Sequence, residues 1–149
     1  MATEVRAARI GEETELLRLY EWLFAAPGRK PAGWDTGRAR QALGEAIAGE
    51  DAAVLIAEDD GEAIGLCTAY LDLHSVRFGL RCWVEDLAVD PGRRSQGVGG
   101  ALLDAAAVWA RERGATHLEL DTGLARTDAQ RFYDRRDPAA TGYSYSWGL

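Results

Sequence analysis

The chain has 149 residues, of which 47% are hydrophobic and 28% are charged. This is the size and balance of one compact domain, expected to span residues 1–149, and it needs no disulfide or structural metal to build a core. Its 24 acidic side chains exceed its 17 basic ones, which gives a net charge of −7. An acidic chain of this kind is a poor partner for nucleic acid and favours a cationic small molecule.

The cysteines and the apolar segments indicate the cellular compartment in which the protein works. Cys67 and Cys82 each lie in an apolar stretch, and the 2 histidines stand alone, so the sequence contains no pattern of metal ligands. We interpret both thiols as core residues of a protein in a reducing compartment. No apolar run approaches the ~20 residues of a membrane span, and the N-terminus lacks the apolar segment of a signal peptide. We expect a cytoplasmic protein with no metal and no membrane association.

The first half of the chain predicts a strand, two helices and a hairpin. The expected elements are a strand at Thr3–Ile10, a helix at Glu12–Phe24, a loop at Ala25–Trp34, a helix capped by Asp35 and running through Ile47, and strands at Ala53–Glu58 and Glu62–Leu73. Asp60-Gly61 separates the last two strands and is a typical two-residue hairpin turn. These two strands are therefore expected to be antiparallel neighbours.

The second half predicts a β-α-β unit followed by a helix and a strand. The expected elements are a strand at Leu80–Val89, a helix at Gly97–Arg113, a strand at Thr116–Asp121, a short helix at Asp128–Arg135 and a final strand at Thr141–Trp147, with Tyr143, Tyr145 and Trp147 on one face. The long helix carries an apolar stripe that includes Val98, Leu102 and Trp109. A right-handed crossover makes the flanking strands parallel neighbours, with a ligand crevice at their C-terminal ends.

A glycine-rich segment, residues 90–100, joins a predicted strand end to a helix start. Backbone amides in such a loop, together with the positive end of the helix, favour a pyrophosphate. A Walker A loop is excluded, because the lysine and the hydroxyl residue that must follow Gly97 are missing. A dinucleotide-binding loop stays open, because Asp121 ends the next strand, although Leu102 replaces the third glycine. A glycine-rich helix start that binds no ligand also stays open.

The pattern Arg94-x-x-Gly97-x-Gly99, after the strand Trp83–Val89, resembles motif A of the GNAT superfamily of acetyl-CoA-dependent N-acetyltransferases. The resemblance implies an α/β fold with a mixed, mostly antiparallel central sheet, helices on both faces and a parallel β-α-β unit that binds acetyl-CoA. It also implies that Leu87 and Val89 pair with the pantetheine arm, and that backbone amides of the loop hold the pyrophosphate. Those amides belong to Arg94, Ser95, Gln96, Gly97, Val98, Gly99 and Gly100.

The segment Ala129-Gln-Arg-Phe-Tyr133 resembles motif B of the same family, which implies that Tyr133 protonates the departing thiolate of coenzyme A. A tyrosine that only packs its helix against the core is the alternative. Three residues before Ala129, the family's usual asparagine is Arg126, which stands at a cofactor contact. Many members form dimers, so the resemblance also allows a homodimer.

The adjacent carboxylates Glu85 and Asp86 interrupt an otherwise apolar strand and resemble a pair in polyamine-type members of the family. Glu85 is the expected general base, and Asp86 is a candidate for holding a cationic substrate. Neighbouring strand residues face opposite sides, so only one of the two is expected to face a given cleft. The alternative is that they are structural carboxylates paired with Arg77 or Arg81.

These features together imply an N-acetyltransferase in which a primary amine attacks acetyl-CoA directly. The expected acceptor is a small amine such as an aminoglycoside, a polyamine or an amino-acid derivative, with Trp22, Phe24 and Trp34 as candidates for the wall of its pocket. Two alternatives remain. One is a regulatory module that binds coenzyme A or acetyl-CoA without turnover, and the other is an acetyltransferase of protein lysines or N-termini.

Overall fold

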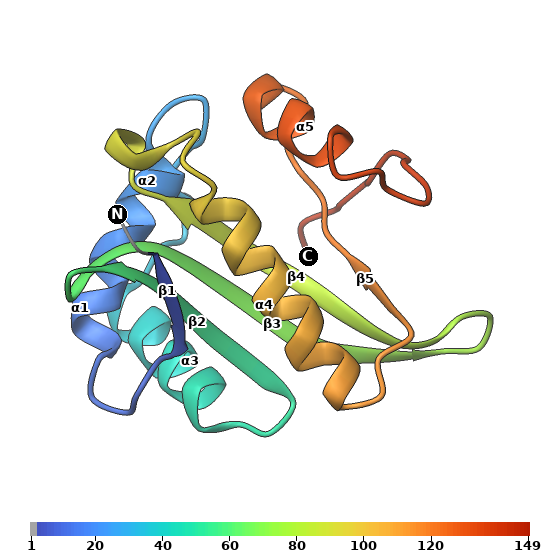
Figure 1. Ribbon diagram of the computed structural model, residues 1–149, viewed down its shortest axis with the longest axis horizontal. Coiled ribbons are helices and arrows are strands. Elements are labelled where there is room, and N and C mark those ends of the chain that lie inside the picture. Colours follow the sequence, from blue (N-terminus) through green and yellow to red (C-terminus); the bar gives the residue numbers. More distant parts are fainter. Residues whose placement is uncertain (1–2) are drawn as a thin grey trace.

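The computed structural model describes residues 3–149, which contain one five-stranded sheet in the order β1-β2-β3-β4-β5 (Figure 1). The elements are β1 (Glu4–Ala7), α1 (Glu13–Leu17), η1 (Arg18–Tyr20), α2 (Glu21–Phe24), α3 (Thr36–Ala48), β2 (Ala52–Asp59), β3 (Glu62–Ser75), β4 (Gly79–Val89), η2 (Pro91–Arg93), α4 (Val98–Glu112), β5 (His117–Glu119) and α5 (Thr127–Asp134). Strands β1 to β4 are antiparallel, and β5 runs parallel to β4. The predicted mixed, mostly antiparallel sheet is confirmed.

Local sequence signals account for several of these elements. Asp60 and Gly61 both adopt positive φ, of 52° and 79°, which is the geometry of the predicted tight turn between β2 and β3. The Asp35 carboxylate accepts a hydrogen bond of 3.0 Å from the Arg38 backbone N–H and so caps α3, as expected. The single helix predicted for Glu12–Phe24 is instead divided into the short segments α1, η1 and α2.

Helices cover both faces of the sheet (Figure 1). On one face α4 inserts Leu102 and Ala106, which are fully buried. A Cβ at Gly65 of β3 would lie 2.9 Å from Leu102 Cδ1, so only glycine lets α4 pack this close to the strand. On the other face α1 and α3 bury Leu16 and Leu43. In the described part of the chain, no helix has the length and apolar character to cross a membrane.

Both cysteines are buried free thiols in the core beneath α4. Burial raises the pKa of Cys67 to about 12 and that of Cys82 to about 11, so both remain protonated at neutral pH. Their interpretation as core residues is confirmed.

Strand β5 pairs with β4 over a short stretch, from Arg81 opposite His117 to Trp83 opposite Glu119. The parallel pairing predicted for the β-α-β unit is confirmed. The strand itself covers only His117–Glu119 and is shorter than the predicted Thr116–Asp121. Beyond Trp83 the strand β4 continues without a partner on this side. β4 and the chain after β5 part at this point, which opens the sheet.

The final strand predicted for Thr141–Trp147 is wrong, because no strand follows α5 in the described chain. Tyr143, Tyr145 and Trp147 are 80%, 76% and 80% exposed. Alternating polar and apolar residues form a strand only where a neighbouring strand supplies hydrogen bonds and packing. The edge strand β5 is too short to provide that neighbour.

Candidate active site

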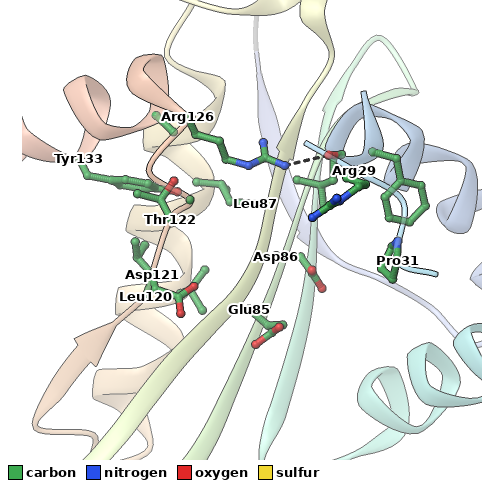
Figure 2. Close-up of a pocket in the computed structure, with 15 residues that line it drawn as sticks. Arg29, Pro31, Glu85, Asp86, Leu87, Leu120, Asp121, Thr122, Arg126 and Tyr133 are labelled. Atoms are coloured by element: carbon green, nitrogen blue, oxygen red, sulfur yellow. Dashed lines mark hydrogen bonds between the residues drawn. The ribbon is translucent and has the colours of Figure 1, made fainter. Parts of the chain in front are cut away.

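A pocket of about 250 Å³ lies where β4 and the chain after β5 diverge (Figure 2). It is lined by Leu23, Phe24, Arg29 and Pro31 from α2 and the following loop, by Val84, Glu85, Asp86 and Leu87 from β4, by Leu120, Asp121, Thr122 and Gly123 after β5, and by Arg126, Ala129 and Tyr133 at the start of α5 and within it. The structure thus brings together six of the predicted site residues, namely Phe24, Glu85, Asp86, Leu87, Arg126 and Tyr133. It is also the crevice expected at the C-terminal ends of the parallel strands.

The pocket receives two adjacent carboxylates because β4 contains a bulge. Asp86 lies opposite Thr68 on β3 and Val84 lies opposite Ala69, which leaves Glu85 as an extra residue without a partner. The expectation that only one of the two carboxylates can face a cleft is therefore wrong. It assumed an unbroken alternation of side chains along the strand.

The packing on either side of the bulge supports this description. Before the bulge, Cys82 and Val84 are buried in the core beneath α4. After the bulge, Leu87 and Val89 pack against that same core. The alternation has moved by one residue, which turns Asp86 away from α4 and toward the side of the sheet that carries Tyr20.

Asp86 is held by two hydroxyl groups. Its carboxylate accepts hydrogen bonds from Tyr20 Oη at 2.8 Å and from Thr68 Oγ1 at 2.7 Å. Burial and the neighbouring Asp86 carboxylate raise the pKa of Tyr20, so that this phenol remains a donor. Neither donor carries a positive charge, so the protein fixes the position of Asp86 without neutralising it.

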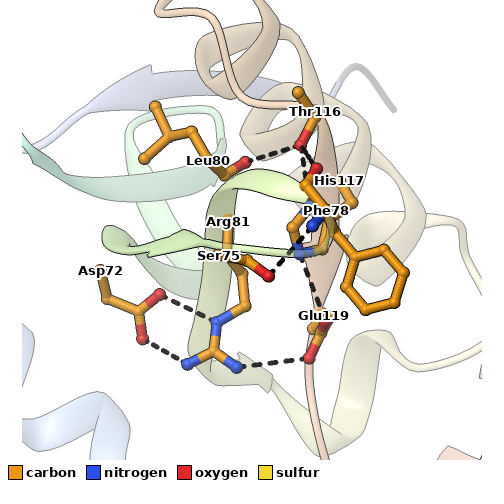
Figure 3. Close-up of polar contacts among 8 residues, drawn as sticks. All are labelled: Asp72, Ser75, Phe78, Leu80, Arg81, Thr116, His117 and Glu119. Atoms are coloured by element: carbon orange, nitrogen blue, oxygen red, sulfur yellow. Dashed lines mark hydrogen bonds and ion pairs between the residues drawn. The ribbon is translucent and has the colours of Figure 1, made fainter.

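Glu85 is exposed to the pocket and has a single hydrogen-bond donor, Trp83 Nε1, at 2.6 Å. The alternative prediction, that Glu85 and Asp86 pair with Arg81 or Arg77, is wrong, because both arginines have other partners. Arg81 pairs with Asp72 at 2.8 Å and with Glu119 at 3.4 Å, as Figure 3 shows. The Arg77 guanidinium lies 4.7 Å from the centre of the Phe78 ring.

The Arg81 network ties together the strands that lead to the pocket. By bridging a carboxylate of β3 and one of β5, the Arg81 guanidinium holds three strands together along the short β4–β5 pairing. Nearby, the Thr116 hydroxyl donates to the backbone oxygen of Phe78 at 2.6 Å, and Thr116 contacts His117 Nδ1 at 2.9 Å (Figure 3). The strands are thus fixed on one side of the point of divergence and separate on the other.

Tyr133 of α5 enters the pocket from the side opposite α2 (Figure 2). Burial raises the pKa of its hydroxyl to about 12, so Tyr133 is protonated throughout the physiological range. No other residue between 3 and 149 forms a hydrogen bond with this hydroxyl. It is therefore available as a donor to a ligand.

Arg126, where the family's usual residue is asparagine, links the two sides of the pocket. Its Nη2 donates a hydrogen bond of 2.8 Å to the backbone oxygen of Leu23 at the end of α2, 103 residues earlier in the chain (Figure 2). The guanidinium thus spans the space between α5 and α2. Arg29, on the loop after α2, also lines the pocket and was not among the predicted site residues.

The aromatic residues predicted for the pocket wall take different positions. Phe24 lines the pocket, and Trp34 packs edge-on against it with 4.9 Å between ring centres. Trp34 also lies 6.2 Å from the Tyr20 ring. Trp22 is half-buried and is not part of the lining. Trp34 therefore supports the wall from behind, whereas Trp22 does not contribute to it.

The glycine loop precedes α4 and presents a row of backbone donors. Gly97 adopts a left-handed φ of 85°, which turns the chain into the helix. Among the described residues, no acceptor meets the backbone N–H groups of residues 94–100. A Cβ at Gly99 would lie 3.5 Å from the Phe132 ring, so α5 packs against this loop. Unpaired amides at a helix start fit the pyrophosphate of coenzyme A, and the antiparallel sheet excludes the dinucleotide-binding alternative.

Comparison with known proteins places this arrangement in a family. The chain matches the acetyltransferase (GNAT) family over residues 16–137 and belongs to that family. An uncharacterised N-acetyltransferase of Bacillus subtilis, YhdJ, is 37% identical over 60% of this chain and 63% of its own. The aminoalkylphosphonate N-acetyltransferase of Salmonella typhimurium is 35% identical over 60% of this chain and 58% of its own. The chain therefore spans about three fifths of the length of these relatives.

The fold is also that of solved acetyltransferases. The aminoglycoside N-acetyltransferase AAC(6')-Iy in complex with CoA superposes with a TM-score of 0.83, at 20% identity, over 99% of this chain and 95% of that one. At this identity the likeness establishes the fold alone. It confirms the α/β architecture expected from the family resemblance.

Proposed function

We propose that this protein is an N-acetyltransferase that transfers the acetyl group of acetyl-CoA directly to the primary amine of a small molecule. The observation that carries the proposal is the pocket at the β4–β5 divergence, where Glu85 and Asp86 lie on one wall and a protonated tyrosine, Tyr133, enters from another. Membership of the acetyltransferase (GNAT) family supports it. So does the likeness to relatives named for amine acetylation.

Acetyl-CoA would be held along β4 and at the start of α4. The unpaired amides of residues 94–100 bind its pyrophosphate, and the unpaired edge of β4 at Leu87 and Val89 receives the pantetheine arm. Arg126 contacts the cofactor where the two walls of the pocket approach each other. The bound thioester supplies the activated acetyl group.

Glu85 is the proposed general base. An alkylammonium with a pKa of ~10.4 must lose a proton before it can attack, which costs about 4.6 kcal/mol at neutral pH. Glu85 is exposed at the pocket and accepts that proton directly or through a water molecule. Asp86, with its charge not neutralised by the protein, attracts the ammonium group to the same wall.

Tyr133 is the proposed general acid. As the amine nitrogen bonds to the acetyl carbon, the carbon–sulfur bond breaks and the negative charge moves to sulfur. The Tyr133 hydroxyl donates a hydrogen bond and then its proton to that thiolate, and its raised pKa keeps the donor protonated until the step occurs. The acceptor nitrogen loses its second proton as the amide forms, and a proton from the solvent restores the Tyr133 hydroxyl. The reaction uses no covalent enzyme intermediate, which agrees with the burial of both cysteines.

We further propose that residues 1–149 act as one domain, as a homodimer in the cytoplasm, without metal, membrane or nucleic acid. The net charge of −7 argues against nucleic acid, and the two free thiols suit a reducing compartment. The exposed aromatic side chains of Tyr143, Tyr145 and Trp147 support the homodimer, because a second copy would remove them from water.

The assay is release of free coenzyme A thiol from acetyl-CoA in the presence of small amines. We expect Glu85→Gln to lose activity most strongly near neutral pH and to regain part of it at alkaline pH, where the amine loses its own proton. Glu50→Gln, an exposed position outside the pocket, serves as the control. An unchanged pH–rate profile for Glu85→Gln would remove Glu85 as the base. Binding of acetyl-CoA without thiol release would indicate a regulatory module instead.

A further inference from the structure

Charged side chains of both signs line the pocket without pairing to one another. Glu85, Asp86 and Asp121 supply negative charge, and Arg29 and Arg126 supply positive charge. Across the described range 3–149, none of these five forms an ion pair. Several arginines elsewhere in the protein do form ion pairs. Arg6 of β1, Arg81 of β4, Arg131 of α5 and Arg136 just after α5 each pair with a carboxylate.

Of the two basic side chains, Arg126 is held in place by the protein. The hydrogen bond from Arg126 Nη2 to the Leu23 backbone oxygen uses one N–H group of the guanidinium and fixes its direction across the pocket. A guanidinium has five N–H donors, so donors remain for a ligand. In Figure 2, Arg126 and Arg29 come from opposite walls and lie toward one end of the pocket, and Glu85 and Asp86 lie toward the other end.

This separation indicates a ligand with two unlike ends. An ammonium group is stabilised beside Glu85 and Asp86, whereas an anionic group is stabilised by guanidinium donors, which match the geometry of carboxylates and phosphonates. A purely cationic molecule that fills the pocket places positive charge against Arg29 and Arg126, and that contact is repulsive. The charges of the pocket therefore complement a molecule that carries an amine and an acid.

We propose that the acceptor is a small zwitterionic amine, an amino acid or an aminoalkylphosphonate, whose anionic group binds Arg29 and Arg126 while its amine faces Glu85. The inference rests on the proposed acetyltransferase function and narrows its substrate class. Arg29, on the loop after α2, makes the site prefer acceptors that carry an anionic group. Arg126 binds the anionic end of the acceptor in addition to its contact with the cofactor.

The test compares amines that differ in charge, and the two zwitterions and ethanolamine are matched in size. The probes are 2-aminoethylphosphonate and β-alanine as zwitterions, ethanolamine as a neutral-ended amine, and spermidine and kanamycin as polycations. We expect kcat/KM for at least one zwitterion to exceed that for ethanolamine and for both polycations by about tenfold or more. The two zwitterions distinguish a phosphonate from a carboxylate as the bound anion.

Variants then locate the anionic end. We expect Arg29→Gln to reduce the preference for the zwitterion over ethanolamine by about tenfold, through KM for the acceptor. Arg40→Gln, an exposed arginine of α3, should leave that preference unchanged. An unchanged preference in Arg29→Gln, or a higher kcat/KM for ethanolamine or a polycation, would overturn this inference alone. Failure of all five amines to release thiol would instead overturn the proposed acetyl transfer.

Discussion

The role proposed for Tyr133 makes a quantitative prediction for Tyr133→Phe. The hydroxyl has no hydrogen-bond partner among residues 3–149, so its removal leaves no other group unsatisfied, and the ring can keep its place in the pocket. We expect the free energy of unfolding to change by no more than about 0.5 kcal/mol. A change in rate can then be assigned to the reaction rather than to the fold.

The size of the rate effect follows from the charge that the hydroxyl stabilises. A hydrogen bond to a charged group contributes about 1.5–3 kcal/mol, which corresponds to a fall in kcat of about 10- to 150-fold. The pKa of Tyr133 is raised to about 12 by burial, so the wild-type donor stays protonated at every pH at which the enzyme is assayed. The ratio of wild-type to variant kcat is therefore expected to be independent of pH.

The measurement is thiol release at saturating acetyl-CoA and acceptor, with a thermal melt of each protein as the control for folding. We expect KM for acetyl-CoA to change little, because the contact is made mainly as the thiolate forms. A Tyr133→Phe protein with the kcat of the wild type would refute this reasoning and assign Tyr133 to packing.

Three further predictions concern the glycine loop, the core and acid stability. Gly97→Ala and Gly114→Ala both place a side chain at φ 85°, so each should lose about 1–2 kcal/mol of stability, but only Gly97→Ala should raise KM for acetyl-CoA in the thiol assay. Leu102→Ala should cost about 2–5 kcal/mol in urea unfolding, whereas Val108→Ala, half-exposed on the same helix, should cost about 0.5 kcal/mol or less. The Arg6 guanidinium lowers the pKa of Glu12 to about 2, so Glu12 stabilises the folded state above its unfolded pKa of ~4.3, and this contribution is lost as the pH falls toward 2. Glu12→Gln should therefore show a smaller decrease in Tm than the wild type between about pH 5 and pH 2.

The parts of the fold that local patterns determine were predictable from the sequence. The Asp60-Gly61 turn fixes the register of the β2–β3 hairpin, and Asp35 caps α3. The β-α-β unit followed from the apolar stripe of one helix between two strands. The remaining parts of the fold depend on which strands pair in the folded protein. The tail at residues 141–149 has the alternation of a strand, yet the short β5 offers it no edge.

In the candidate site, too, local motifs were predictable from the sequence and long-range contacts were not. The residues of the glycine loop and Tyr133 were identified because their motifs are continuous in the sequence. The joint exposure of Glu85 and Asp86 was not predictable, because the bulge depends on how β4 pairs with β3. The hydroxyl of Tyr20 meets Asp86 across 66 residues, and Arg126 reaches Leu23 across 103. No local pattern signals contacts of that range, and Arg29 carried no signal in the sequence at all.

The most direct test of the proposed function is to mix the purified protein with acetyl-CoA and a panel of small amines, and to measure free thiol and acetylated product together. We predict that at least one amine stimulates thiol release, with one equivalent of N-acetylated amine detected by mass spectrometry for each thiol released. Tight binding of acetyl-CoA with no amine-dependent thiol and no acetylated product would contradict the proposed function.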